Sequence, residues 1–144
     1  MKEILVAIDG SRHSRKILEV AAALAKNLQA GVVTVYVIPS SHVPQDYEKY
    51  AEAEGIDPSA YLASLATQIV NDAENQLENS GVQAEGLSLS GNPAEVILKT
   101  AKSRGAAMIV MGVQGLHGIG RMRALGSISR RVIENSEVPV LAVP

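Results

Sequence analysis

The chain has 144 residues, of which 47% are hydrophobic and 19% are charged. A chain of this length can bury a core without disulfides, so we expect a single domain over residues 1–144. The formal net charge of −2 gives no overall positive field for DNA or RNA. No apolar run approaches the roughly 20 residues that span a membrane.

Residue types that are missing narrow the class of protein further. Zero cysteine excludes disulfides, thiolate metal centres and cysteine nucleophiles, and it is compatible with a reducing compartment. Zero Trp, zero Phe and only four Tyr exclude a stacked aromatic platform for single-stranded nucleic acid. The first residues show no signal-peptide cleavage pattern. We therefore expect a cytoplasmic protein with no nucleic-acid partner and no membrane association.

Strands and helices alternate in the first part of the chain. An apolar run over residues 3–8 stops at Asp9-Gly10-Ser11 and predicts a strand that is buried on both faces. Apolar residues then recur at helical spacing from Ser11 to Gln29, and the run Val32 to Ile38 predicts a second strand. The acidic stretch from Ser40 to Pro58 is interpreted as a surface loop or a short helix.

The second half of the chain continues this alternation. Asn92-Pro93-Ala94-Glu95 predicts a helix start, with Asn as the cap, Pro in the first position and Glu placed to reach back to the N–H of the cap. The other predicted elements are a helix over 59–79, a strand over 82–89, a helix end near Arg104, a strand over 106–111, a helix over 127–135 and a strand over 140–143.

This order predicts an α/β fold: a three-layer α/β/α sandwich around a five-stranded, mostly parallel sheet of the Rossmann-like type. Ligands of such sheets bind beyond the carboxyl ends of the strands, at the point where the strand order reverses. Three segments follow strands and so lie at that edge: Asp9-Gly10-Ser11, residues 37–40 and residues 112–127.

The segment from Gly112 to Ser127 favours an anion site. It holds five of the chain's twelve glycines, which let backbone N–H groups turn inward, and it leads into a helix start that favours negative charge. The alternative is a turn that needs glycine only for its tight geometry. The Lys of a Walker loop is missing before Ser127, and Arg123 occupies the last glycine position of a dinucleotide fingerprint, so both motifs are excluded.

Over its whole length the chain resembles the universal stress protein family. The resemblance rests on Asp9-Gly10-Ser11 after the first strand, on Met111-Gly112, on the loop that closes at Gly126-Ser127, and on the last strand after Val138-Pro139-Val140. The ATP-binding branch of that family has Gly, two residues, Gly, nine residues, then Gly with Ser or Thr. Here Gly112 and Gly115 are followed by ten residues before Gly126-Ser127.

The resemblance implies a fold like that of the adenine nucleotide alpha hydrolases and a site for ATP or a related adenine nucleotide, with any Mg²⁺ arriving on the phosphates. It implies that Ala7 and Asp9 line the adenosine pocket and that the backbone of Val37 meets the adenine edge. Met111 and Gly112 would border the base and ribose. The phosphates would lie at Gly115, Gly126, Ser127 and the N–H of Ile128.

Several of these residues have a second interpretation. Asp9 can instead cap the helix that starts near Ser11, and Ser127 is expected first as a helix cap. Arg121 and Arg123 either reach the phosphates or lie in solvent. His13, His42 and His117 lie in three separate segments without the spacing of metal ligands, so we expect them at the surface.

The sequence thus predicts a nucleotide-dependent regulator in the stress response. No general base is identifiable, so at most slow ATP hydrolysis is expected. The last strand is expected at a sheet edge, where pairing with a second copy gives a homodimer. The ten-residue spacing keeps open a homodimeric interaction protein that binds no nucleotide, and an enzyme for a small anionic substrate is a third hypothesis.

The charge of the chain is unevenly distributed. Residues 105–133 contain four arginines and no acid, whereas residues 46–57 contain five acids and one lysine. A net charge that argues against a large polyanion therefore still permits a local site for one small polyanion.

Overall fold

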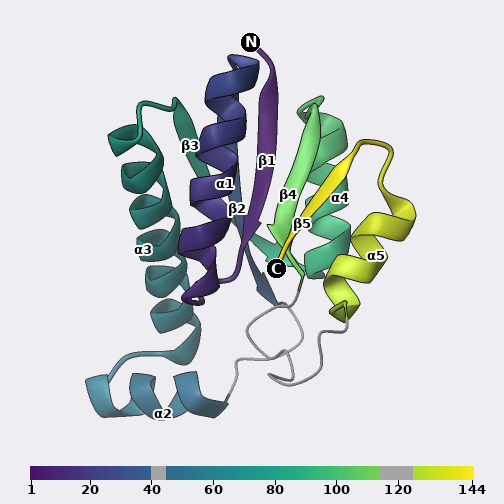
Figure 1. The fold of residues 1–144 in the computed structure, drawn as a ribbon. Coiled ribbons are helices and arrows are strands. Elements are labelled where there is room, and N and C mark those ends of the chain that lie inside the picture. Colours follow the sequence, from purple (N-terminus) through teal and green to yellow (C-terminus); the bar gives the residue numbers. More distant parts are fainter. Residues whose placement is uncertain (40–44, 114–124) are drawn as a thin grey trace.

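A sheet of five parallel strands is the centre of this computed structural model, which describes residues 1–39, 45–113 and 125–144. The order across the sheet is β3-β2-β1-β4-β5, and all four neighbouring pairs are parallel. The sheet that the sequence predicts is therefore confirmed, and it is parallel throughout (Figure 1). The strands are β1 (Glu3–Ile8), β2 (Gly31–Pro39), β3 (Ala84–Gly91), β4 (Met108–Gly112) and β5 (Val140–Val143).

Helices cover both faces of the sheet and complete the predicted three-layer sandwich (Figure 1). One face carries α1 (His13–Leu28) and α3 (Pro58–Asn79), and the other carries α4 (Pro93–Ser103) and α5 (Ser127–Asn135). The remaining helix, α2 (Gln45–Glu54), packs against α3 near the carboxyl ends of the strands. Within the described residues, no helix is long and apolar enough to cross a membrane.

The sheet has one hydrophobic core on each face, and this explains why β1 is an unbroken apolar run. Ile4 and Val6 point to the α1 and α3 face and are fully buried, while Leu5 points to the α4 and α5 face and is 1% exposed. A central strand with helices on both faces has no side that faces solvent, so its sequence does not alternate between apolar and polar residues.

Local hydrogen bonds account for two strand boundaries that differ from the predictions. The N–H of Val82 bonds to the carbonyl of Leu77 and closes α3, so β3 begins two residues later than expected, at Ala84. In the same way the N–H of Ala106 bonds to the carbonyl of Ala101 at the end of α4, and β4 begins at Met108. Residues that look like strand starts are in both cases helix ends.

The helix caps agree with the predictions in part. Asn92 accepts a hydrogen bond from the N–H of Glu95 at 3.2 Å, as expected. The carboxylate of Glu95 was expected to reach back to the cap, but it pairs with Arg131 at 3.0 Å. Within the acidic stretch 40–58, the structure shows a helix, α2, followed by Asp57, which caps α3 through the N–H groups of Ser59 and Ala60.

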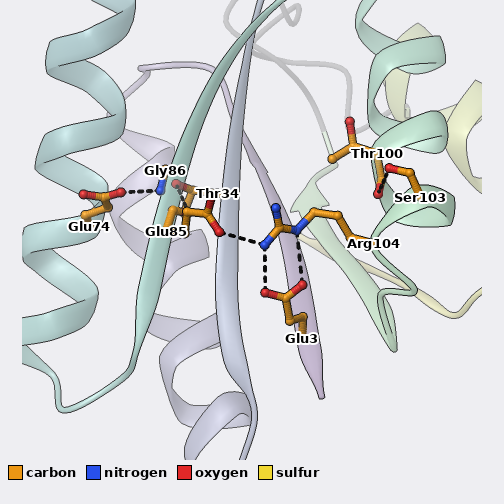
Figure 2. A network of polar contacts seen from close by, with 8 residues as sticks. All are labelled: Glu3, Thr34, Glu74, Glu85, Gly86, Thr100, Ser103 and Arg104. Carbon is orange, nitrogen blue, oxygen red and sulfur yellow. Dashed lines mark hydrogen bonds and ion pairs between the residues drawn. The ribbon is translucent and has the colours of Figure 1, made fainter. Parts of the chain in front are cut away.

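The two edges of the sheet differ. At β3 the carboxylate of Glu74 on α3 accepts a hydrogen bond from the N–H of Gly86, so that α3 covers the outer backbone of the strand (Figure 2). A Cβ at Gly86 would lie 2.9 Å from the Cβ of Val70, so glycine is what lets α3 approach so closely. At the other edge, Val140, Leu141 and Ala142 of β5 remain half-exposed.

Candidate functional site

The strand order reverses between β1 and β4. After β1 the chain adds β2 and β3 on one side, and it then returns to place β4 and β5 on the other side of β1. The helix after β1 covers one face of the sheet, and the helix after β4 covers the opposite face. Open α/β sheets bind their ligands at such a point, beyond the carboxyl ends of the strands. We therefore call the region between the ends of β1 and β4 the candidate crevice. The sequence-predicted segments that contain Asp9 and Gly112 border this crevice.

Asp9 follows β1 directly and is half-buried. Its Oδ1 accepts hydrogen bonds from the N–H of Ser11 at 2.9 Å and from the hydroxyl of Ser14 at 3.3 Å. Among the described residues, none donates a hydrogen bond to Oδ2. The N-cap of α1 is Arg12, and Asp9 bonds Ser11 before the helix and the hydroxyl of Ser14, so the interpretation of Asp9 as a helix cap is wrong. Asp9 instead orders the turn that leads into α1, and we take its Oδ2 as the candidate acceptor for a ligand.

Gly10 makes the turn from β1 into α1 possible. Its φ of +78° lies in the left-handed region, which residues with a side chain rarely adopt. A Cβ at this position would lie 2.8 Å from Cδ1 of Ile69 on α3. The backbone angle therefore favours glycine next to Asp9, whereas the contact is with the flexible end of the Ile69 side chain, which can shift.

The second wall of the crevice begins at the end of β4. The N–H of Gly126 donates to the carbonyl of Val113 at 2.8 Å, and the hydroxyl of Ser129 donates to the carbonyl of Gly112 at 2.7 Å. These bonds hold the start of α5 against the last residues of β4. Gly115, Arg121 and Arg123 lie between them, outside the described residues.

The start of α5 has no side-chain cap. Gly126 is the N-cap residue, with φ −64° and ψ 158°, and Ser127 is the first helical residue, so the expectation that Ser127 is the cap is wrong. The first N–H groups of a helix have no carbonyl partner within it, and a capping side chain otherwise uses them. Among the described residues, no side chain caps this end, so the backbone N–H groups of Ser127 and Ile128 are candidates for binding an anion.

Three adjacent strands bring the remaining predicted residues to the same end of the sheet, where the crevice lies. Ala7, Val37 and Met111 lie near the carboxyl ends of β1, β2 and β4. The side chains of Val37 and Met111 are 9% and 4% exposed and belong to the core under α4 and α5. A ligand above the sheet would therefore meet their backbone rather than their side chains.

Two buried hydroxyl groups at the site escaped the sequence analysis. Ser14 and Ser129 are 8% and 3% exposed, and each ties the start of a helix to the end of the preceding strand. Their signal was present, since each lies three residues before a buried apolar residue of its helix, Ile17 and Val132. A serine on the apolar stripe of a helix near its start is a candidate for such a bond.

The histidines form no metal site in the described part of the chain. No group of three or more His, Asp or Glu side chains there could hold a metal ion. His13, expected at the surface, is half-buried, and its Nε2 lies 2.9 Å from the carbonyl oxygen of Val143 on β5. His42 and His117 lie outside the described residues.

A separate cavity of about 490 Å³ lies at the opposite end of the sheet, where the amino ends of the strands lie, between the end of α4 and the turn that precedes β5. Lys99, Lys102 and Glu137 are among its lining residues, and none of the predicted site residues lines it. It therefore does not belong to the crevice between β1 and β4.

Comparison with known proteins agrees with this fold. The family model described as "Universal stress protein family" matches residues 1–144. The universal stress protein YxiE of Bacillus subtilis is 35% identical, over 98% of this chain and 97% of that protein.

Solved structures show the same architecture. The structure of the protein MJ0577 is 27% identical, with a TM-score of 0.80 over 99% of this chain and 94% of that one. The universal stress protein of Archaeoglobus fulgidus in complex with dAMP is 23% identical, with a TM-score of 0.70 over 100% of this chain and 98% of that one. This chain belongs to the universal stress protein family.

Proposed function

We propose that this protein binds ATP or a related adenine nucleotide in the crevice between β1 and β4 and acts as a nucleotide-dependent regulator in the stress response. The observation that carries the proposal is the position of Asp9 and of the uncapped start of α5 on the two sides of this crevice. One wall offers a carboxylate oxygen, which suits hydroxyl and amino groups. The other wall offers N–H groups and the positive end of a helix, which suit phosphate.

The nucleotide would lie across the ends of three strands. Its adenosine part would contact Asp9 and the backbone of Ala7, Val37 and Met111. The phosphates would lie over Gly112 and Gly115 and bind the N–H groups of the first turn of α5. Mg²⁺, where it takes part, would be held mainly by phosphate oxygens, as is usual for this ion.

The family supports the adenine nucleotide in particular. The Archaeoglobus fulgidus structure is that of a universal stress protein in complex with dAMP. Its fold covers this chain completely, so an adenine nucleotide is the ligand class to test first.

The proposed role is binding rather than rapid turnover. Oδ1 of Asp9 already accepts two hydrogen bonds, and its geometry suits a carboxylate that orients a ligand. Slow hydrolysis at most is the proposed activity. We also propose a homodimer that pairs through the half-exposed edge of β5, and a cytoplasmic location in keeping with the absence of cysteine.

The test is the identity and affinity of the bound small molecule. Freshly purified protein is denatured, and any released nucleotide is identified by mass spectrometry. The emptied protein is then titrated with ATP, AMP and adenosine, and with GTP as the matched control for the base. Co-purified adenine nucleotide, or adenine-specific binding in the titration, supports the proposal.

The opposite result has a defined meaning. No co-purified nucleotide and no binding at about millimolar concentration, a free energy near −4 kcal/mol, would remove the nucleotide from this function. A stable dimer under those conditions would then favour the homodimeric interaction protein, for which the half-exposed edge of β5 is the supporting observation.

A further inference from the structure

Four polar side chains are buried within the described residues: Ser14, Thr34, Thr100 and Ser129. The two threonines serve regular structure. Thr100 donates to the carbonyl of Val96 one turn earlier in α4, and Thr34 donates to the carbonyl of Glu85 on the neighbouring strand. The two serines differ, because each bonds a group at the carboxyl end of a strand that borders the crevice.

The two serine bonds are related by the topology of the sheet. Ser14, on α1, bonds Asp9 at the end of β1, whereas Ser129, on α5, bonds Gly112 at the end of β4. The strands β1 and β4 are neighbours, and the two helices lie on opposite faces of the sheet. Each wall of the crevice is therefore held by one buried hydroxyl.

We propose that Ser14 and Ser129 are positioning residues for opposite ends of the nucleotide. This assignment rests on the proposed function. Ser14 orients the carboxylate of Asp9 for the adenosine end, and Ser129 holds the first turn of α5 for the phosphate end. Neither serine touches the nucleotide in this arrangement, because both side chains are buried under the walls that they hold.

The geometry of Asp9 gives Ser14 its role. Both hydrogen bonds to the carboxylate end on Oδ1, one from the N–H of Ser11 and one from the hydroxyl of Ser14. Two donors on one oxygen define the rotation of the carboxylate and direct Oδ2 to the ligand. Removing the hydroxyl of Ser14 leaves Asp9 present but frees this rotation, so every ligand that contains adenosine should bind more weakly.

The geometry of α5 gives Ser129 a different role. Its hydroxyl donates to a carbonyl of β4 and accepts no hydrogen bond from the first turn of its own helix, so it leaves the N–H groups of that turn for an anion. The bond at 2.7 Å also sets the distance between the helix start and the end of β4. Removing it should weaken only the part of the affinity that comes from phosphate.

The experiment compares ATP with adenosine for Ser14→Ala and Ser129→Ala in the full chain. A tenfold loss of affinity corresponds to about 1.4 kcal/mol of binding free energy. For Ser129→Ala we expect a loss of about that size for ATP and less than about twofold for adenosine. For Ser14→Ala we expect equal losses for both ligands. Thr100→Val, which removes a buried hydroxyl far from the crevice, is the matched control and should change neither affinity.

The conservative variants separate positioning from folding. Ser14→Thr and Ser129→Thr keep the hydroxyl and should recover the affinity that alanine loses. Where an alanine variant does not fold, the cysteine variant of the same position, of similar size and with a weaker donor, should show the same pattern with a smaller loss. Adenosine binding also shows directly that Ser129→Ala is folded.

The outcomes separate the two proposals. If the wild type binds ATP and adenosine, but Ser129→Ala loses both equally or neither serine variant differs from Thr100→Val, the positioning roles are wrong and the proposed function stands. If the wild type binds neither ligand, the proposed function is wrong and this assignment falls with it.

Discussion

Arg104 and Glu3, 101 positions apart in the chain, are joined by two hydrogen bonds at the end of the sheet opposite the crevice (Figure 2). Nε of Arg104 donates to Oε1 of Glu3 at 3.1 Å, and Nη2 donates to Oε2 at 3.0 Å. Nη2 also donates to Oε2 of Glu85 at 2.7 Å. The guanidinium thus links the end of α4 to the first residues of β1 and β3, across β2.

Arg104→Lys should lower the stability of the fold. Lysine keeps the charge but loses the planar fork that bonds both oxygens of Glu3, so we expect the free energy of unfolding to fall by about 1 kcal/mol. Urea unfolding measures this loss. Arg131→Lys is the control, because its pair with Glu95 is exposed, so the substitution should change stability by less than about 0.5 kcal/mol. Equal losses in the two variants would contradict a special role for Arg104.

The pH dependence of this link follows from the pKa of Arg104. The hydrogen bond to Glu3, with a further contribution from Glu85, raises this pKa above its ordinary value, although partial desolvation opposes the rise. A cation whose pKa is raised by folding stabilises the fold fully below its unfolded pKa and loses this effect only as pH rises through the folded pKa. The stability difference between wild type and Arg104→Lys should therefore stay constant from neutral pH to about pH 9. A difference that shrinks within that range would show that another group controls it.

Asp9→Ala should reduce the affinity for adenine nucleotides about tenfold or more, because the ligand loses its acceptor at the end of β1. Calorimetric titration with ATP and adenosine measures the change. Asp57→Ala is the matched control, since that carboxylate caps α3 and is not part of the β1 and β4 segments that border the crevice. The control should lose about 1 kcal/mol of stability and no affinity. Unchanged affinity in Asp9→Ala would remove Asp9 from the site.

Gly126→Asp should stabilise the fold slightly and weaken nucleotide binding. The extended backbone at this position suits any residue, and an aspartate N-cap accepts hydrogen bonds from the first turn of the helix. We expect a gain of a few tenths of a kcal/mol in stability. The new carboxylate takes the N–H groups proposed for phosphate and repels it, so ATP should lose more affinity than adenosine. Thermal unfolding and titration of both ligands test this, and an ATP affinity equal to that of the wild type would count against the anion site.

Ala142→Pro should abolish the proposed homodimer and leave the fold intact. The carbonyls of Pro139 and Val143 accept hydrogen bonds from the N–H groups of Ile109 and Val113, so these two residues of the β5 segment face β4. Successive residues of a strand direct their backbone groups to opposite sides, so the N–H of Ala142 points to the free edge. Leu141→Pro, one residue earlier, removes an N–H that faces β4 and should unfold the strand. Sedimentation of the wild type should give twice the chain mass of 15.2 kDa, and Ala142→Pro should give the chain mass alone. A wild type that sediments as a monomer would overturn the dimer.

Element types and their order followed from local patterns along the chain. Residues 127–135 and 140–143 were predicted with the bounds that the structure shows, because Gly126 and Pro139 mark those starts directly. The strand and helix alternation also predicted the parallel sheet, since each parallel pair needs a crossover. The predicted start of β3 was wrong, because Val82 belongs to the apolar run of the strand but its N–H closes the end of α3. The sequence pattern does not reveal such a closing hydrogen bond.

Local patterns by themselves predicted the site only as separate segments, and the family resemblance was what joined them into one expected site. Asp9, Gly112 and Gly126-Ser127 stood out because strand ends and helix starts carry polar and glycine residues. Which strands are neighbours is set by packing between distant residues, and only the fold shows that β1 and β4 adjoin. The buried bonds of Ser14 and Ser129 likewise depend on where each helix lies over the sheet. The sequence by itself thus determined which segments carry polar and glycine residues at strand ends and helix starts. Only the packing of distant residues in the tertiary structure decided that these segments lie next to one another.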